Sequence, residues 1–206
     1  MQTKKSPQKE EIAWALDYLP YGKSDDSRPI YQRKPLIQAI GESQFVLMEL
    51  IPKDDMVTVI PERLYIGDGE REKIDHVKGR LRYAELSNSA NLELLPTIEE
   101  IILNDVPRFI KIFNDAYPIS TRLHMLELFP GIGKKLMWNI LDERKKGPFK
   151  DFADLMGRVK GLHKPEGIIA RRIVDEIMDD EIKHRMFTTL PKQAPPSKSP
   201  QSKYRR

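Results

Sequence analysis

The sequence predicts an α+β protein in which a small N-terminal β-barrel precedes an α-helical domain. Two patterns carry this prediction. Short apolar runs separated by turn residues fill residues 30–86, and apolar residues at helical spacing dominate after residue 96. The size agrees, because 206 residues with 39% hydrophobic and 32% charged side chains can bury a core in one or two domains.

The barrel is predicted from about five short strands. The apolar and β-branched runs are 35–40, 44–51 and 56–60, a short segment at 63–66 extends the pairing, and a longer candidate covers 74–84. Gly41-Glu42-Ser43 has the composition of a hairpin turn. Strands of this number and spacing match an OB-like or Sm-like barrel, which we assign to residues 10–95. Residues 10–19 are expected to form either a short helix or an extended arm.

The helical half divides into two parts. Residues 96–119 are expected to be connecting helices, the first capped by Thr97 with Glu100 three residues later and broken at Pro107. Residues 120–187 are expected to form the helical domain, with helices at 122–128, 134–146, 149–156 and 166–178 and a continuation of the last, or another helix, over 179–187.

Composition excludes several classes of protein. With no cysteine, disulfides and zinc–cysteine or iron–sulfur sites are excluded. No apolar run is long enough to cross a bilayer, and the N-terminus lacks a secretory leader, so we expect a cytoplasmic protein with no membrane partner. Residues 1–9 and the basic segment 188–206 are expected to be disordered.

Positive charge is concentrated in the C-terminal part of the chain. Residues 12–119 hold 13 Lys and Arg against 18 Asp and Glu, whereas residues 120–206 hold 19 against 11. This asymmetry favours a polyanion-binding C-terminal half. A basic tail that only keeps the protein soluble is the alternative interpretation.

One short motif indicates how a polyanion is held. In Leu128-Phe129-Pro130-Gly131-Ile132-Gly133-Lys134-Lys135, the glycines allow close backbone approach, Ile132 pins the loop to the core, and the lysines add charge. The next helix begins at Gly133 and Lys134, so its unpaired N–H groups can bind a phosphate oxygen. No residue of this motif reads a base edge, and we therefore expect binding that is largely independent of sequence.

The octet resembles the helix-hairpin-helix motif of DNA-repair, recombination and RNA-processing proteins. The following Gly147-Pro148-Phe149 is similar to the linker of tandem domains, in which a second, often degenerate hairpin follows. Here the second hairpin keeps Gly161 but lacks a second glycine at the matching spacing. The resemblance implies that the nucleic-acid-binding residues are Pro130, Gly131, Ile132, Gly133, Lys134 and Lys135, with Gly161 and Lys164 of the second hairpin as further candidates. Arg171 and Arg172 are added as a basic cluster on a helix, which either contacts phosphates or is a solvated face.

The order of a short barrel and this helical domain resembles the archaeal domain-of-unknown-function six-fifty-five family. The segment 72–83 and the motif near Phe129 carry this resemblance. It implies an OB-like barrel with helix-hairpin-helix motifs in a predicted RNA-binding protein, and no established activity.

We therefore expect a non-catalytic protein that binds the phosphate backbone of RNA or DNA, RNA being favoured, with no cofactor and no metal. The first alternative is a protein–protein adaptor in a translation or repair assembly, because the acidic barrel is a poor surface for nucleic acid. The second is a DNA glycosylase or lyase, because Lys135 stands where such enzymes carry a catalytic lysine. However, Asp151 and Asp154 lie in the wrong context for that chemistry.

Overall fold

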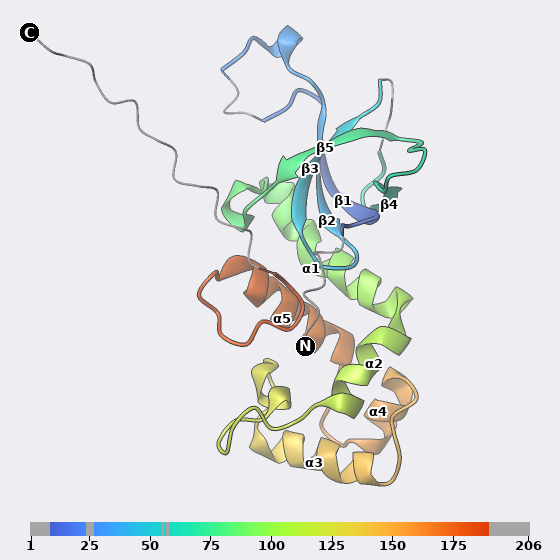
Figure 1. The fold of residues 1–206 in the computed structure, drawn as a ribbon, viewed down its shortest axis with the longest axis vertical. Helices are drawn as coiled ribbons and strands as arrows, with labels where there is room; N and C mark the ends of the chain where they lie inside the picture. Colours follow the sequence, from blue (N-terminus) through green and yellow to red (C-terminus); the bar gives the residue numbers. More distant parts are fainter. Residues whose placement is uncertain (1–8, 24–26, 55, 57, 190–206) are drawn as a thin grey trace, which may run out of the picture.

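The computed structural model describes residues 9–23, 27–54, 56 and 58–189, and confirms the α+β class. Five strands form one antiparallel sheet in the order β4-β1-β2-β3-β5. Figure 1 shows this sheet at one end of the molecule, α3 and α4 at the other, and α1 and α5 between them. The strands are β1 (Ile12–Leu19), β2 (Leu36–Gly41), β3 (Leu47–Pro52), β4 (Glu62–Tyr65) and β5 (Ile74–Arg80).

The helices follow the sheet in the chain. The α-helices are α1 (Asn88–Asn104), α2 (Val106–Asp115), α3 (Lys134–Lys145), α4 (Phe152–Arg158) and α5 (Pro165–Met178). Short 3₁₀ turns are η1 (Ile30–Gln32), η2 (Tyr83–Glu85) and η3 (Met125–Leu128). No helix of the described residues has the length and apolar content needed to cross a membrane.

Strand β1 resolves the uncertainty over residues 10–19. It lies inside the sheet, paired with β2 and β4. Both of its faces are buried: Ala13 and Ala15 belong to one apolar cluster, and Trp14 and Leu16 to another. A strand buried on both faces shows no polar alternation, which explains why the sequence pattern did not identify it.

The predicted strand at 56–60 is wrong for its described residues, which lead irregularly into β4. Residue 57 lies outside the described part of the chain. The apolar run is explained instead by partial burial, since Thr58 is buried and Ile60 packs against the sheet cluster. The edge position beside β1 is taken by β4, which begins at Glu62 directly after Pro61.

Helix α1 begins at Asn88, within the range expected for the barrel domain. Its N-cap is Ser87, whose hydroxyl accepts a hydrogen bond from the Ala90 N–H at 3.0 Å, so the predicted cap at Thr97 is wrong. One core continues from the sheet face of Trp14 and Leu16 through α1 and α2 to the C-terminal helices. The predicted break at Pro107 is confirmed, because Asp105 caps α2 there.

The predicted helix 122–128 is also wrong, since only the last four residues form the 3₁₀ turn η3. The Ser120 hydroxyl accepts hydrogen bonds from the Arg122 and Leu123 N–H groups, which closes a tight turn and not a helix. His124 then caps η3, its Nδ1 accepting from the Leu126 N–H at 3.1 Å. Side chains that compete for backbone N–H groups in this way favour turns.

Residues 179–187 do not form a helix. The fully buried carboxylate of Glu176 holds the chain beyond α5 by accepting hydrogen bonds from the N–H groups of Met186, Phe187 and Thr188 at 2.8–3.0 Å. The Phe187 ring packs against the rings of Phe45, Phe109 and Phe129. This segment therefore joins the β2–β3 turn, α2 and the end of η3. The expected basic tail lies outside the described residues from 190 onward.

Candidate nucleic-acid interface

Two turns of the helical half share one geometry. Each follows a short helix and precedes a longer one: Phe129 to Ile132 lies between η3 and α3, and Val159 to Leu162 lies between α4 and α5. The N–H of the fourth residue donates to the carbonyl of the first, at 3.1 Å in the first turn and 3.3 Å in the second. The third residue is Gly131 or Gly161, with φ of +88° and +89°. The fourth, Ile132 or Leu162, is buried.

The two glycines of the first turn have different reasons for being glycine. Gly131 needs to be glycine because its φ is positive, a conformation that costs any L-residue with a Cβ. Gly133 has an ordinary φ of −84°, and among the described residues no atom beyond its own chain neighbours lies within 4 Å of where its Cβ would stand. Nothing inside the described protein requires glycine at 133, and this position leaves the backbone bare to the outside.

The bare backbone coincides with unpaired donors. No described residue accepts a hydrogen bond from the backbone N–H of Gly133, Lys134 or Lys135, and α3 has no side-chain N-cap. Both lysine side chains are exposed and form no ion pair within the described residues. Three free amides at the positive end of a 12-residue helix, beside two free ammonium groups, are an arrangement that can attract an anion.

The second turn lacks this arrangement. His163 stands at the position of Gly133, and the next helix starts at Pro165, which has no N–H to offer. Its first turn carries Glu166, and a Cβ at Gly167 would stand 3.1 Å from Glu99 Oε1 of α1. Gly161 and the exposed Lys164 therefore lie in the second turn, as the sequence predicted. However, the acidic side chains of Glu166 and Glu99 and the N–H group that Pro165 lacks disfavour an anion there.

The adjacent arginines Arg171 and Arg172 have different surroundings. Arg171 is exposed on α5. Arg172 is buried, its Nε donates to Glu176 at 3.0 Å, and its other nitrogens donate to the backbone carbonyls of Leu128, Lys183 and His184. The expectation that Arg172 contacts phosphate is therefore corrected: it fastens α5 to η3 and to the C-terminal segment.

The structure adds a groove that the sequence reading did not identify. It is about 670 Å³ in volume and lies between the loop 118–124 and one face of α3. Lys134, Trp138, Leu141 and Lys145 line it at i, i+4, i+7 and i+11, a spacing that places them on one helix face. Trp138 is 57% exposed. The sequence contains this spacing, so a tryptophan between two lysines on one predicted helix face could have indicated the groove.

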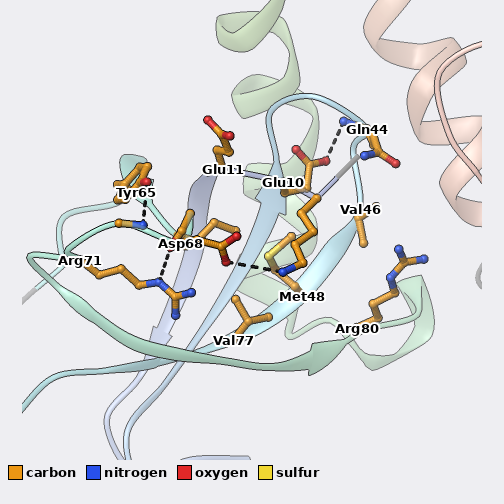
Figure 2. Close-up of a pocket in the computed structure, with 14 residues that line it drawn as sticks. Glu10, Glu11, Gln44, Val46, Met48, Tyr65, Asp68, Arg71, Val77 and Arg80 are labelled. Atoms are coloured by element: carbon orange, nitrogen blue, oxygen red, sulfur yellow. Dashed lines mark hydrogen bonds and ion pairs between the residues drawn. The ribbon is translucent and has the colours of Figure 1, made fainter. Parts of the chain in front are cut away.

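A second hollow, of about 720 Å³, lies on the sheet (Figure 2). Its lining is balanced in charge, with Lys9, Arg71 and Arg80 against Glu10, Glu11 and Asp68. Lys9 pairs with Asp68, Arg71 donates to the Gly67 carbonyl, and the Tyr65 hydroxyl accepts from the Gly69 N–H. Burial raises the pKa of the Glu10 carboxyl, although the carboxylate accepts from the Ser43 and Gln44 N–H groups. This hollow is not a basic surface.

The two aspartates considered with the glycosylase alternative, Asp151 and Asp154, have structural partners. The Asp151 side chain caps α4 by accepting from the Asp154 N–H at 2.7 Å. The Asp154 carboxylate accepts from the Lys150 N–H and pairs with Arg158, and these hydrogen bonds lower its pKa. Within the described part of the chain, no three His, Cys, Asp or Glu residues come together as a metal site.

Comparison with known proteins gives one consistent result. Residues 9–189 match the model of a protein family of unknown function, DUF655. An uncharacterized protein of Methanocaldococcus jannaschii, MJ0038, is 45% identical over 179 residues, which cover 86% of this chain and 79% of the relative. The crystal structure of Af1531 from Archaeoglobus fulgidus, of the same family, superposes with a TM-score of 0.83 at 45% identity, and covers 87% of this chain and 100% of that one.

Proposed function

Because the chain belongs to the DUF655 family, whose description assigns no activity, we propose from its geometry that the protein binds nucleic acid by the phosphate backbone, without catalysis. The binding element is the turn 129–133 with the first residues of α3. RNA is the favoured partner, an expectation that rests on the family resemblance and not on a base contact.

The observation that carries the proposal is Gly133. Its backbone conformation and its surroundings both admit a side chain, yet the residue exposes bare backbone beside three unpaired amides and two free lysines. A phosphate oxygen fits this combination, because amides at a helix N-terminus attract negative charge and lysines strengthen the attraction. Contacts of this kind position a backbone and carry no sequence information.

The tandem helix-hairpin-helix interpretation is part of the proposal. Nearly equal φ values at Gly131 and Gly161 and the same turn hydrogen bond support a repeated hairpin, of which the second copy loses one of the three amide donors at Pro165. The strand order β4-β1-β2-β3-β5, with β4 and β5 at the edges, supports an OB-like barrel that is open between those edges. Matched charges in the sheet hollow favour a protein partner there, so the adaptor role remains the second candidate.

Salt dependence tests the proposal. Binding of a fluorescein-labelled RNA oligonucleotide should weaken steeply between about 50 and 200 mM salt, because each neutralised phosphate releases counterions. Lys134→Ala and Lys135→Ala should each lower the slope of log K against log salt by about 0.7–0.9 and weaken all sequences about equally. Lys111→Ala, an exposed lysine on α2, is the matched control and should change little.

Two results would contradict the proposal. Absence of binding to RNA and DNA at low salt, or a flat salt dependence, favours the adaptor. Strand cleavage or base excision by the wild type that Lys135→Ala abolishes revives the lyase interpretation, and the non-catalytic part of the proposal is then wrong.

A further inference from the structure

The groove beside the hairpin has one acidic side chain and several basic ones. Glu127 is the acid among its lining residues, and the basic ones are Arg122, Lys134, Arg144 and Lys145. Arg144 is occupied by the backbone carbonyls of Phe113, Asn114 and Ala116, and Lys145 pairs with Asp142 at 2.8 Å. Arg122 and Lys134 have no side-chain partner among the described residues, and they stand on the two walls of the groove.

The groove that these two cations line also holds an exposed aromatic ring. Trp138 is 57% exposed and packs against no other aromatic ring of the described residues, with Met137 and Leu141 beside it in the lining. A large ring left in water at the side of a groove loses the free energy that its burial would supply. An exposed tryptophan in one groove with free cations is the arrangement on which single-stranded nucleic acids stack their bases.

Lys134 connects this groove to the phosphate site. It is the first residue of α3, so its amide belongs to the hairpin and its side chain lines the groove. Trp138 follows one helical turn later, about 6 Å along the axis. That step is comparable to the separation between a base and its own phosphate, so one nucleotide can reach both sites.

We propose that the groove between loop 118–124 and α3 holds an unpaired nucleobase stacked on Trp138, while the neighbouring phosphate occupies the amides at Gly133–Lys135. This inference rests on the proposed function and narrows it. The ligand is a single-stranded segment or unpaired end, and not a continuous duplex. Inside a duplex each base is already stacked and paired, so its face is closed to a side chain.

Tryptophan fluorescence reports this contact selectively. The chain has two tryptophans, and Trp14 is buried, with its Nε1 donating to Glu42 at 2.8 Å. Adding a single-stranded oligouridylate to the full chain should quench the fluorescence of Trp138 and shift the anisotropy of a labelled strand at the same concentrations. A blunt duplex of equal length should bind more weakly and leave the emission unchanged.

Three variants complete the test. Trp138→Ala should weaken single-strand binding about 5- to 150-fold, the range for one stacked base. Trp138→Phe should recover most of the affinity because it keeps an aromatic face. Leu92→Ala removes another exposed apolar side chain, on α1, and should have no effect. Circular dichroism melting checks that each variant is folded.

The outcomes separate this inference from the proposed function. Binding that depends on Gly133 but not on Trp138, or that is tighter for the blunt duplex, overturns the groove assignment and leaves phosphate binding standing. If no oligonucleotide binds at low salt, phosphate binding itself is refuted, and the groove assignment is refuted with it.

Discussion

Replacing the glycines of the two turns with alanine should separate affinity from stability. At Gly133 an added Cβ meets no protein atom within 4 Å and φ is −84°, so Gly133→Ala is accommodated by the fold. The methyl group instead occupies the space in which a phosphate oxygen approaches the α3 amides. Gly131→Ala adds the same methyl group at φ +88°, where the backbone itself is strained.

The magnitudes follow from these conformations. For Gly133→Ala, the unfolded chain loses entropy worth about 0.4–1 kcal/mol, which offsets the similar cost of a poorer N-cap. The melting temperature should therefore stay within about 2 °C. Gly131→Ala and Gly161→Ala should each cost about 1–2 kcal/mol, a fall of about 2–8 °C. Loss of one charge-assisted hydrogen bond, about 1.5–3 kcal/mol, raises the Kd of Gly133→Ala about 10- to 150-fold.

The assay combines thermal melting with anisotropy on one labelled RNA. Gly133→Ala should lose affinity only, Gly161→Ala stability only, and Gly131→Ala both. Gly161→Ala is the matched control, because its φ of +89° reproduces the strain in the turn where Pro165 removes one donor and Glu166 adds negative charge. Tight binding by a folded Gly133→Ala protein would refute the assignment, and equal loss of affinity in Gly161→Ala would show that both hairpins bind.

Two further predictions concern stability. Burial, reinforced by the charge of Arg144, lowers the pKa of His124. The stability that neutral His124 provides is therefore present above the unfolded-state pKa of about 6.5 and is lost as the pH falls through the lower folded-state pKa. In urea unfolding, the free energy of unfolding should fall between pH 7.5 and 5.5. His124→Asn should reduce this fall, and the exposed variant His163→Asn should not. An equal pH dependence in the wild type and both variants would count against this. Glu176→Gln leaves Arg172 unpaired in the core and should cost about 3 kcal/mol or more, about 6 °C or more in melting temperature, whereas exposed Glu181→Gln should be neutral. An unchanged melting temperature for Glu176→Gln would show that the carboxylate does not hold the C-terminal segment.

Local patterns predicted the elements whose signals are local. Pro107 after Asp105 marked the break between α1 and α2, and Gly147-Pro148 marked the end of α3. The run from Pro130 to Lys135 predicted a turn that enters a helix, and the structure has that turn. The start of α1 was missed because Ser87 is an ordinary polar residue in the sequence, and its capping role depends on the helix that follows.

The sequence by itself determined the α+β class, the concentration of positive charge after residue 120 and the position of the turn before α3, because composition and glycine conformation are properties of the local sequence. Only the tertiary structure decided which basic groups are free. Arg171 and Arg172 are adjacent in the chain, yet α5 turns one to water and the other into the core, where carbonyls far along the chain surround it. Only folding likewise brought loop 118–124 beside Trp138, since a groove is formed by segments that contact one another in space.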